Sequence, residues 1–365
     1  MKIFRAGAYE AFYDMPLDIN WDLTVQCNYR CSYCFIYGKG KNPPPQLPFS
    51  TLNQLKAAVD NIASLNRPWY NVSLSGGEPT IHPHLIDLIY LLHEKLQERL
   101  NNILIISNGS RNESLYKKLA EISKSINLNL LISIHTDHVD MAHVLELIEN
   151  LSRNIKIYFV LMFNPDKREE VHLIYDIMCE YRKNFPFNMG IDILRDGDHI
   201  DSRHTQEDFA WHKFATEKFT ALADSLASKF PPQKKSKHNF RMFHDLEIDG
   251  KRQIIETTDY KSNLPQGLAK FTDMYCIAHT TVLKIEPDGF CCGMACIADP
   301  FICNIYEEGS LKAARKDLIH AIVCPCDVCG CISNYYIPKF TSRLEAARFI
   351  ETVDAKQQAL FDAAQ

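Results

Sequence analysis

Three cysteines near the start of the chain, Cys27, Cys31 and Cys34, follow the spacing CxxxCxxC. Three thiolates on one short loop can hold a cubane iron-sulfur cluster and leave its fourth iron open to another ligand. A structural zinc site normally has four protein ligands, and a catalytic one usually includes His or a carboxylate. The residues just after the triplet offer neither. The spacing therefore favours an iron-sulfur cluster, with zinc or unligated thiols as the alternatives.

A second, larger group of cysteines lies between residues 276 and 331, where nine of the chain's 13 cysteines fall. Disulfides are rarely maintained in the cytosol, so this number indicates metal or redox chemistry. Residues 287–289 (Pro-Asp-Gly) predict a hairpin turn, and cysteines flank it. We therefore expect a second metal site. Tetrahedral zinc stays open as an alternative, because the spacing of Cys326 and Cys329 suits zinc equally well.

Between residue 18 and about residue 195, strand-like runs alternate with helix-like segments. This alternation is typical of repeated βα units around a parallel sheet. The predicted strands are 17–24, 70–75, 103–107, 128–135, 155–162 and 189–194, and the predicted helices between them are 51–65, 83–99, 113–123, 139–151 and 167–182. Six units are too few for an eight-stranded barrel. On the pattern alone a doubly wound sheet is also possible.

Polar residues follow these predicted strands at the point where each strand ends. Residues 76–79 (Gly-Gly-Glu-Pro) follow the second strand, residues 107–109 (Ser-Asn-Gly) follow the third, and Ser133 and His135 end the fourth. Parallel α/β folds bind their ligands at the carboxyl ends of the strands. We therefore expect these residues and the cysteine triplet to meet at one mouth of the sheet.

Composition limits the classes of protein and of partner. A chain of 365 residues that is 46% hydrophobic can form a large core. Its net charge of -5 gives no general electrostatic reason to expect a nucleic-acid partner. The start of the chain lacks the apolar stretch of a signal peptide, and no apolar run of about 18 residues is present. We expect a soluble cytoplasmic protein without a membrane partner, in which Cys179 is a buried thiol.

The CxxxCxxC triplet, Tyr33 before its last Cys, and residues 75–79 (Ser-Gly-Gly-Glu-Pro) together resemble the radical S-adenosylmethionine (radical SAM) superfamily. The resemblance implies a partial, open (β/α)6 barrel. It also implies a [4Fe-4S] cluster whose open iron binds the amino and carboxylate groups of SAM. In this family the reduced cluster cleaves SAM to a 5'-deoxyadenosyl radical.

The resemblance also suggests which residues bind SAM. Gly76, Gly77 and Glu78 would bind the methionine amino group, with Pro79 fixing the turn. Ser107 and Asn108 resemble a segment near the ribose or methionine end. The remaining predicted contacts are Ser133, Tyr33 over the adenine, and Met162. His135 is a candidate proton donor or substrate ligand, although a His without a visible partner is more often a hydrogen-bonded structural residue.

The cysteine-rich tail resembles the auxiliary-cluster appendages called SPASM and twitch domains. A twitch-like domain with one auxiliary [4Fe-4S] cluster fits the cysteine count better than the two-cluster form. Its expected ligands are Cys276 and Cys296 with two of Cys324, Cys329 and Cys331. Cys292 and Cys326 are reserves, and Cys291 and Cys303 are expected to be packing residues.

The expected division of the chain is a barrel core at 1–195, a connecting segment at 196–270, an auxiliary domain at 271–340 and a C-terminal helix at 341–365. The resemblance implies hydrogen-atom abstraction from a substrate, with flavodoxin or ferredoxin as the reducing partner. A ribosomally synthesised peptide is the first expected substrate. Oxidation, epimerisation or deoxygenation of a small sugar or aminocyclitol is the second, and a non-catalytic iron-sulfur scaffold or sensor is the third.

Overall fold

A computed structural model describes residues 2–9, 13, 15–34, 36–38, 45–196, 199–230, 242–257, 268, 270–293, 301–314, 320–324 and 337–363. Within these residues the larger of two main sheets has nine strands, in the order β15-β14-β13-β2-β3-β4-β5-β6-β7. The edge strands of this sheet, β15 and β7, do not pair with each other, so the sheet is open.

Six consecutive parallel strands form most of the large sheet. They are β2 (Leu17–Thr24), β3 (Tyr70–Gly76), β4 (Leu100–Ser107), β5 (Leu128–Ile134), β6 (Lys156–Phe163) and β7 (Asn188–Ile193). Each predicted strand is present, with ends that differ by no more than three residues. The mixed α/β class is confirmed.

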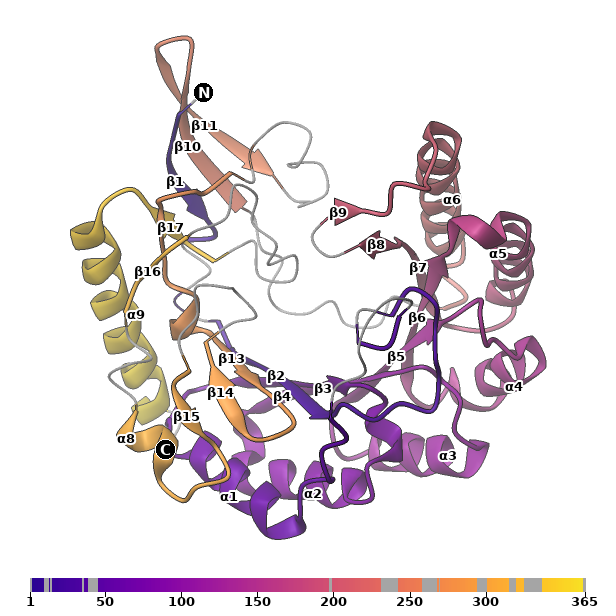
Figure 1. The fold of residues 1–365 in the computed structure, drawn as a ribbon, viewed down its shortest axis with the longest axis horizontal. Coiled ribbons are helices and arrows are strands. Elements are labelled where there is room, and N and C mark those ends of the chain that lie inside the picture. Colours follow the sequence, from indigo (N-terminus) through magenta and orange to yellow (C-terminus); the bar gives the residue numbers. More distant parts are fainter. Residues whose placement is uncertain are drawn as a thin grey trace.

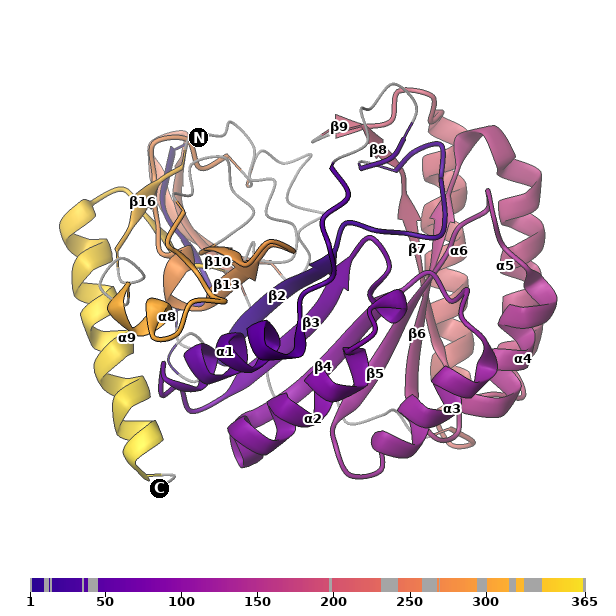
Figure 2. The ribbon, with the colours of Figure 1, turned by 60° about the horizontal axis from the view of Figure 1, so that its bottom comes forward.

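The helices follow these strands along the chain and cover the outer side of the sheet, as Figures 1 and 2 show. They are α1 (Leu52–Ala63), α2 (Leu85–Leu96), α3 (Glu113–Ile122), α4 (Met141–Leu151), α5 (Arg168–Arg182) and α6 (Gln206–Ser225). Capping boxes define two of the helix starts, with Thr51 and Gln54 at α1 and Thr205 and Asp208 at α6.

Side-chain alternation explains why one face of this sheet is polar. In β2 the odd-numbered positions from Leu17 to Leu23 are buried in the same hydrophobic cluster as helix residues such as Leu55. The even-numbered positions carry Asp18, Asn20 and Asp22, which are only partly buried. Because successive side chains of a strand point to opposite faces, these polar residues lie on the inner face, away from the helices.

The predicted hairpin at residues 287–289 is present between β13 (Val282–Ile285) and β14 (Phe290–Cys292). Its strand β13 pairs in parallel with β2, so the hairpin extends the large sheet. β15 (Cys303–Asn304) adds the last strand. The predicted domain limits stay a prediction, but strand pairing here joins a segment after residue 271 to the segment before residue 195.

A second sheet has the order β11-β10-β1-β17-β12-β16. The sequence did not predict its longer strands β1 (Lys2–Gly7), β10 (Met242–Ile248) and β11 (Lys251–Thr257). Its short strands are β17 (Lys339–Phe340), β12 (Tyr275–Cys276) and β16 (Ile322–Val323). In Figure 1 this sheet stands across from α5 and α6.

The C-terminal helix α9 (Arg343–Ala363) packs Ile350 and Val353 in one hydrophobic cluster with Met15 and Ile277. Gln357 donates a hydrogen bond to the carbonyl oxygen of Met15 at 3.2 Å. The remaining short elements are η2 (Pro79–Ile81), η3 (Gln97–Arg99), η4 (Pro165–Lys167), η5 (Ala278–Thr280), β8 (Arg195–Asp196), β9 (His199–Ile200) and α8 (Ser310–Ala313).

Candidate active site

A cavity of about 450 Å³ lies at the carboxyl ends of β2 to β7. Its volume lies within the range of small-ligand sites, roughly 300–1,000 Å³. The predicted site residues that line it are Cys27, Cys31, Cys34, Tyr33, Gly76, Gly77, Glu78, Ser107, Asn108, Ser133, His135 and Met162. Pro79 does not line it, because it is buried as the first residue of η2. Of the residues predicted to bind the first cluster or SAM, together with His135, the structure thus brings all but Pro79 to a single cavity.

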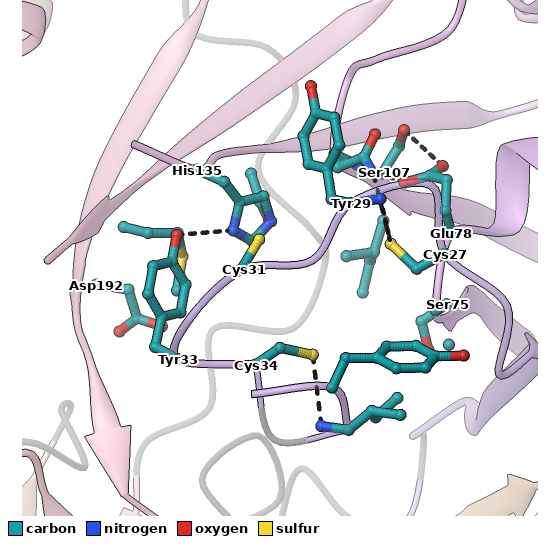
Figure 3. A pocket seen from close by; sticks show the side chains of 18 of the residues that line it. Cys27, Tyr29, Cys31, Tyr33, Cys34, Ser75, Glu78, Ser107, His135 and Asp192 are labelled. Atoms are coloured by element: carbon teal, nitrogen blue, oxygen red, sulfur yellow. Dashed lines mark hydrogen bonds between the residues drawn. The ribbon is translucent and has the colours of Figure 1, made fainter. Parts of the chain in front are cut away.

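The three thiols of the triplet surround one space at the wall of this cavity, as Figure 3 shows. Cys31 is buried, and Cys27 and Cys34 are half-buried. Burial raises the pKa of the Cys27 thiol, and it raises the pKa of Cys31 to about 12. Metal binding would therefore have to displace protons that these thiols hold firmly.

Hydrogen-bond donors point at the sulfur atoms. The backbone N–H of Tyr29 donates to Cys27 Sγ at 3.4 Å, and that of Ile36 donates to Cys34 Sγ at 3.4 Å. The side-chain amide of Asn108 lies 3.8 Å from Cys27 Sγ. Such donors stabilise thiolates and tune the potential of iron-sulfur clusters. Three thiols around one space, with donors aimed at two of them, fit a cluster.

Within the described residues, no three His, Cys, Asp or Glu side chains gather closely enough to bind one metal ion. A cubane does not require such a gathering, since each thiolate binds a different iron atom. The spread of the three sulfurs around the cavity is compatible with this mode of binding.

Gly76 and Gly77 line the cavity and also let two stretches of backbone approach closely. A Cβ on Gly77 would lie 2.1 Å from the carbonyl oxygen of Gln26, and a Cβ on Gly76 would lie 2.4 Å from that of Thr24. Gly76 also has φ +118°, which favours glycine. The pair therefore lets the end of β3 pack against the chain that enters the cysteine loop.

Two short backbone hydrogen bonds depend on this close approach. Gly77 N donates to Thr24 O at 2.6 Å, and Glu78 N donates to Gln26 O at 2.8 Å. These bonds fix the start of the cysteine loop to the residues that precede η2.

Glu78 is 1% exposed and joins the ends of β3 and β4. Its Oε1 accepts from Thr80 N at 3.0 Å, from the Thr80 hydroxyl, and from Ser107 Oγ at 2.9 Å. Its Oε2 accepts from Asn108 N at 2.7 Å. Burial raises the pKa of this carboxyl, and the donors oppose that effect. A carboxylate offers about four acceptor positions, so Oε2 can accept a further donor from the cavity.

His135 has a partner that the sequence did not reveal. Its Nδ1 and the hydroxyl of Tyr33 are hydrogen bonded at 3.0 Å, and the two rings stack with centroids 5.9 Å apart. Burial, together with the charge of His138, lowers the pKa of His135 to about 4, so the ring is neutral at pH 7. The contact therefore supports a role for His135 in positioning Tyr33.

Sequence reasoning missed several cavity residues. Tyr29 and Tyr37 come from the cysteine loop and the segment after it, and Asp192, Ile193 and Leu194 come from the end of β7. The signal for Asp192 was present, because it is a polar residue near the carboxyl end of a predicted strand. The tyrosines carried no such signal, since aromatic residues beside cysteines serve equally often in packing.

In the cysteine-rich tail, Cys276 and Cys324 are buried; Cys276 lies on β12, and Cys324 directly follows β16, the antiparallel partner of β12. Cys276 is opposite Ile322, and Cys324 N donates to Met274 O at 2.8 Å. The two cysteines are therefore diagonal neighbours on one face of the ribbon, a placement that suits two ligands of one cluster. Cys296, Cys329 and Cys331, and the reserve Cys326, lie outside the described residues.

Cys291 and Cys303 are buried and directly opposite each other on β14 and β15. They belong to the main hydrophobic cluster, in keeping with their expected packing role. Cys292, a reserve ligand, is half-buried next to Cys291. Cys179 is buried in α5, as expected.

Among the helices of the described residues, none combines the length and apolar character needed to cross a membrane.

Comparisons with known proteins agree with this geometry. Residues 21–178 match the Radical SAM superfamily. The antilisterial bacteriocin subtilosin biosynthesis protein AlbA of Bacillus subtilis is 24% identical over 140 residues, which are 38% of this chain and 28% of AlbA. The GTP 3',8-cyclase of Pasteurella multocida is 23% identical over 209 residues, which are 53% of this chain and 59% of the cyclase. The chain thus spans less than two thirds of either relative.

A similar fold occurs in anSMEcpe, whose structure was solved with bound AdoMet and a Kp18Cys peptide. That structure has a TM-score of 0.53 and 14% identity to this chain, and the match covers 96% of this chain and 99% of the other. At this identity the likeness concerns the fold alone. The family model thus matches residues 21–178, the part of the chain that forms strands β2 to β6 and the site above, and the solved structure is similar in fold.

Proposed function

We propose that this chain is a radical SAM enzyme that modifies a ribosomally synthesised peptide. The observation that carries the proposal is the ring of three loop thiols, Cys27, Cys31 and Cys34, at the wall of a cavity lined by residues 76–78. These thiols would hold a [4Fe-4S] cluster, and the cavity would hold SAM. When bound, this pair supplies a 5'-deoxyadenosyl radical that abstracts a hydrogen atom from the substrate.

The chain's own residues would orient SAM. Glu78 Oε2, which accepts only Asn108 N among the described donors, can accept a hydrogen bond from the SAM ammonium. Its other oxygen is held by three donors, so the carboxylate cannot rotate away. Tyr33, fixed by its hydrogen bond to His135, offers a ring face for the adenine.

The apolar part of the cavity wall has a separate role. Ile106, Met162, Ile193 and Leu194 line the cavity together with the polar groups. Radical chemistry requires that water and competing hydrogen donors are excluded from the reacting centre. These side chains would exclude them while one C–H bond of the substrate is held in place.

A peptide substrate is supported by two of the similar proteins. AlbA is named for the biosynthesis of a bacteriocin, and anSMEcpe was solved with a peptide. The matched part of AlbA is only 28% of its length, so the substrate of this chain needs its own test. A small-molecule substrate is the alternative, and the similarity to GTP 3',8-cyclase favours it. The sugar and aminocyclitol reactions named above belong to this alternative.

The finer fold and the second cofactor belong to the same proposal. The open set of strands β2 to β7 would be the partial (β/α)6 barrel of the family. The segment with Cys276 and Cys324 would be a SPASM- or twitch-like appendage with an auxiliary [4Fe-4S] cluster. Flavodoxin or ferredoxin would supply the electron.

The first experiment tests the cluster and SAM cleavage. The full chain is reconstituted anaerobically with iron and sulfide, reduced with dithionite and incubated with SAM. We expect bound iron, a reduced-cluster EPR signal and formation of 5'-deoxyadenosine. Protein that binds iron and SAM but never yields 5'-deoxyadenosine would instead be a scaffold or sensor. Protein that takes up only zinc would end the proposal.

The second experiment tests the substrate class. Candidate precursor peptides encoded near the gene, labelled with deuterium, are compared with labelled sugars and nucleotides. Transfer of deuterium into 5'-deoxyadenosine identifies the class from which the hydrogen atom is taken. Transfer from a small molecule alone would reject the peptide substrate and leave the radical chemistry standing.

A further inference from the structure

The loop that carries the three cysteines, residues 25–34 (the cluster loop), is bound at residues 30–33 by the loop after β5, residues 135–140. His138 Nε2 accepts from Arg30 N at 3.2 Å. Asp137 Oδ2 accepts from both Ser32 N, at 2.8 Å, and Ser32 Oγ, at 2.7 Å. The Tyr33 hydroxyl is hydrogen bonded to His135, as described above.

Three of these four hydrogen bonds fall on the turn that sets the distance between the thiols of Cys31 and Cys34. Cys34 N donates to Cys31 O at 3.1 Å, so residues 31–34 form a turn with Ser32 and Tyr33 at its centre. Asp137 holds the backbone and side chain of the first central residue, and His135 holds the side chain of the second. The geometry of this turn is therefore set from outside the cluster loop.

Asp137 is itself held in place. Its Oδ1 accepts from Asn164 Nδ2 at 3.1 Å, and Asn164 is 3% exposed at the start of η4. The neighbouring carbonyl oxygen of Thr136 accepts from Lys167 Nζ at 2.7 Å. Oδ1 of Asp137 thus binds Asn164, which follows β6, and Oδ2 binds Ser32 of the cluster loop.

We propose that Asp137 is a positioning residue that fixes the Cys31–Cys34 turn and, through its negative charge, lowers the reduction potential of a cluster bound there. The positioning half, that Asp137 fixes the turn, stands on the hydrogen bonds alone. The electrostatic half, that its charge lowers the reduction potential, rests on the proposed function. Its physical basis is that an electron added beside a fixed negative charge is disfavoured, and that the groups around a metal centre tune its affinity and potential.

Two substitutions separate the hydrogen bonds to the cluster loop from the charge. Asp137→Asn keeps an oxygen that can accept from Ser32 but removes the charge. Its NH2 group then faces Asn164 Nδ2, so the hydrogen bond to Asn164 is lost while those to Ser32 remain. We expect its iron content to stay near that of the wild type while its cluster potential, from EPR-monitored redox titration, moves to more positive values. Asp137→Ala removes both, so its iron should be lost to a chelator about 10–100-fold more readily, as for other residues that support metal ligands.

The matched control is Asp140→Asn, in the same loop. The Asp140 carboxylate accepts from His143 N at 3.2 Å and caps α4, and Asn is an equally good cap. No hydrogen bond joins Asp140 to the cluster loop among the described contacts. A potential shift in Asp137→Asn that is no larger than the shift in Asp140→Asn would overturn the electrostatic half.

A readout on metal-free protein tests the turn itself. Trypsin cuts after Arg30 only if the cluster loop is released from its partners, because cleavage requires local opening. We expect faster cleavage in Asp137→Ala than in the wild type and in Asp140→Asn. Equal cleavage in all three would overturn the positioning half. If the wild type binds no cluster, the proposed function fails, and the trypsin comparison still decides the positioning half.

Discussion

The cluster loop and the cysteine-rich tail offer thiols in different ways. The cluster loop carries its three cysteines within eight residues, and neighbouring strand ends hold it through hydrogen bonds to Glu78, Asp137 and His135. In the tail, Cys276 and Cys324 are diagonal neighbours because β12 pairs with β16. Ligands from one loop can be recognised from their spacing. Ligands from separate strands depend on a pairing that spacing does not reveal.

The largest expected effect tests the cluster loop. Cys31→Ala should abolish SAM cleavage, because two thiolates do not retain an open cubane. Iron content and 5'-deoxyadenosine are measured after anaerobic reconstitution. Cys179→Ala, a buried thiol in α5 far along the chain, is the control and should cleave SAM like the wild type. Normal 5'-deoxyadenosine formation by Cys31→Ala would contradict the assignment of the triplet.

The tail should respond differently to the same kind of change. Cys276→Ala should lower total iron and block product formation while some uncoupled SAM cleavage continues, because the SAM site is elsewhere. Cys291→Ala, a packing position on β14, should keep its iron and lose only about 1 kcal/mol of unfolding free energy. Full iron content in Cys276→Ala, or zinc in place of iron, would reject the auxiliary cluster.

The next prediction compares backbone packing beside the cluster loop with that at a turn of the second sheet. Gly76→Ala should lower the unfolding free energy of the metal-free protein by roughly 3 kcal/mol or more, because backbone strain adds to a collision with Thr24 O. Gly250→Ala, in the turn between β10 and β11, has φ +77° and open space around it. Gly250→Ala should lower the unfolding free energy by only about 1 kcal/mol, from the backbone strain of its positive φ. Urea unfolding measures both, and equal losses would show that the close packing at Gly76 contributes nothing.

The smallest expected effect concerns two buried histidines, His135 beside the cluster loop and His244 in the second sheet. Burial lowers the pKa of His135 and of His244, on β10, to about 4, from an ordinary value of 6.5. Above pH 6.5 both are neutral in the folded and unfolded chain. As pH falls from 6.5 towards 4, only the unfolded chain gains these protons, so stability falls by up to about 3 kcal/mol per histidine.

His135→Gln and His244→Gln should each flatten this dependence, measured by urea unfolding of the metal-free protein at several pH values. His135→Gln alone should also release Tyr33, which can be followed as weaker SAM binding after reconstitution. A wild-type protein whose stability does not change between pH 6.5 and 4 would contradict both pKa shifts.

The sequence predicted the large sheet well and the second sheet hardly at all, for a physical reason. Strands β2 to β7 are separated by clear helices and have one face buried against them, so their apolar pattern is strong. β12, β16 and β17 have only two residues each, too few for any period. β10 and β11 mix charged and apolar residues in a segment that was expected to be a connection.

For the site, residue types predicted the cavity, but their contacts could not be predicted. The packing of Gly76 and Gly77 against residues 24–26 could not be predicted without knowing the register of β2 and β3. The hydrogen bonds that occupy most acceptor positions of the Glu78 carboxylate could not be predicted without knowing where β4 lies. The hydrogen bond between Asp137 and Ser32 joins residues 105 positions apart in the sequence. Spacing along the chain carries no information on such contacts.

The place of β1 in the second sheet has a consequence for how the protein is made. β1 precedes β2 along the chain, yet its partners β10 and β17 include residues 242–248 and 339–340. Strands β2 to β7 are all synthesised by residue 193. The half of the molecule with the cluster loop can thus fold during translation, while β1 must wait until the strands that pair with it have been made.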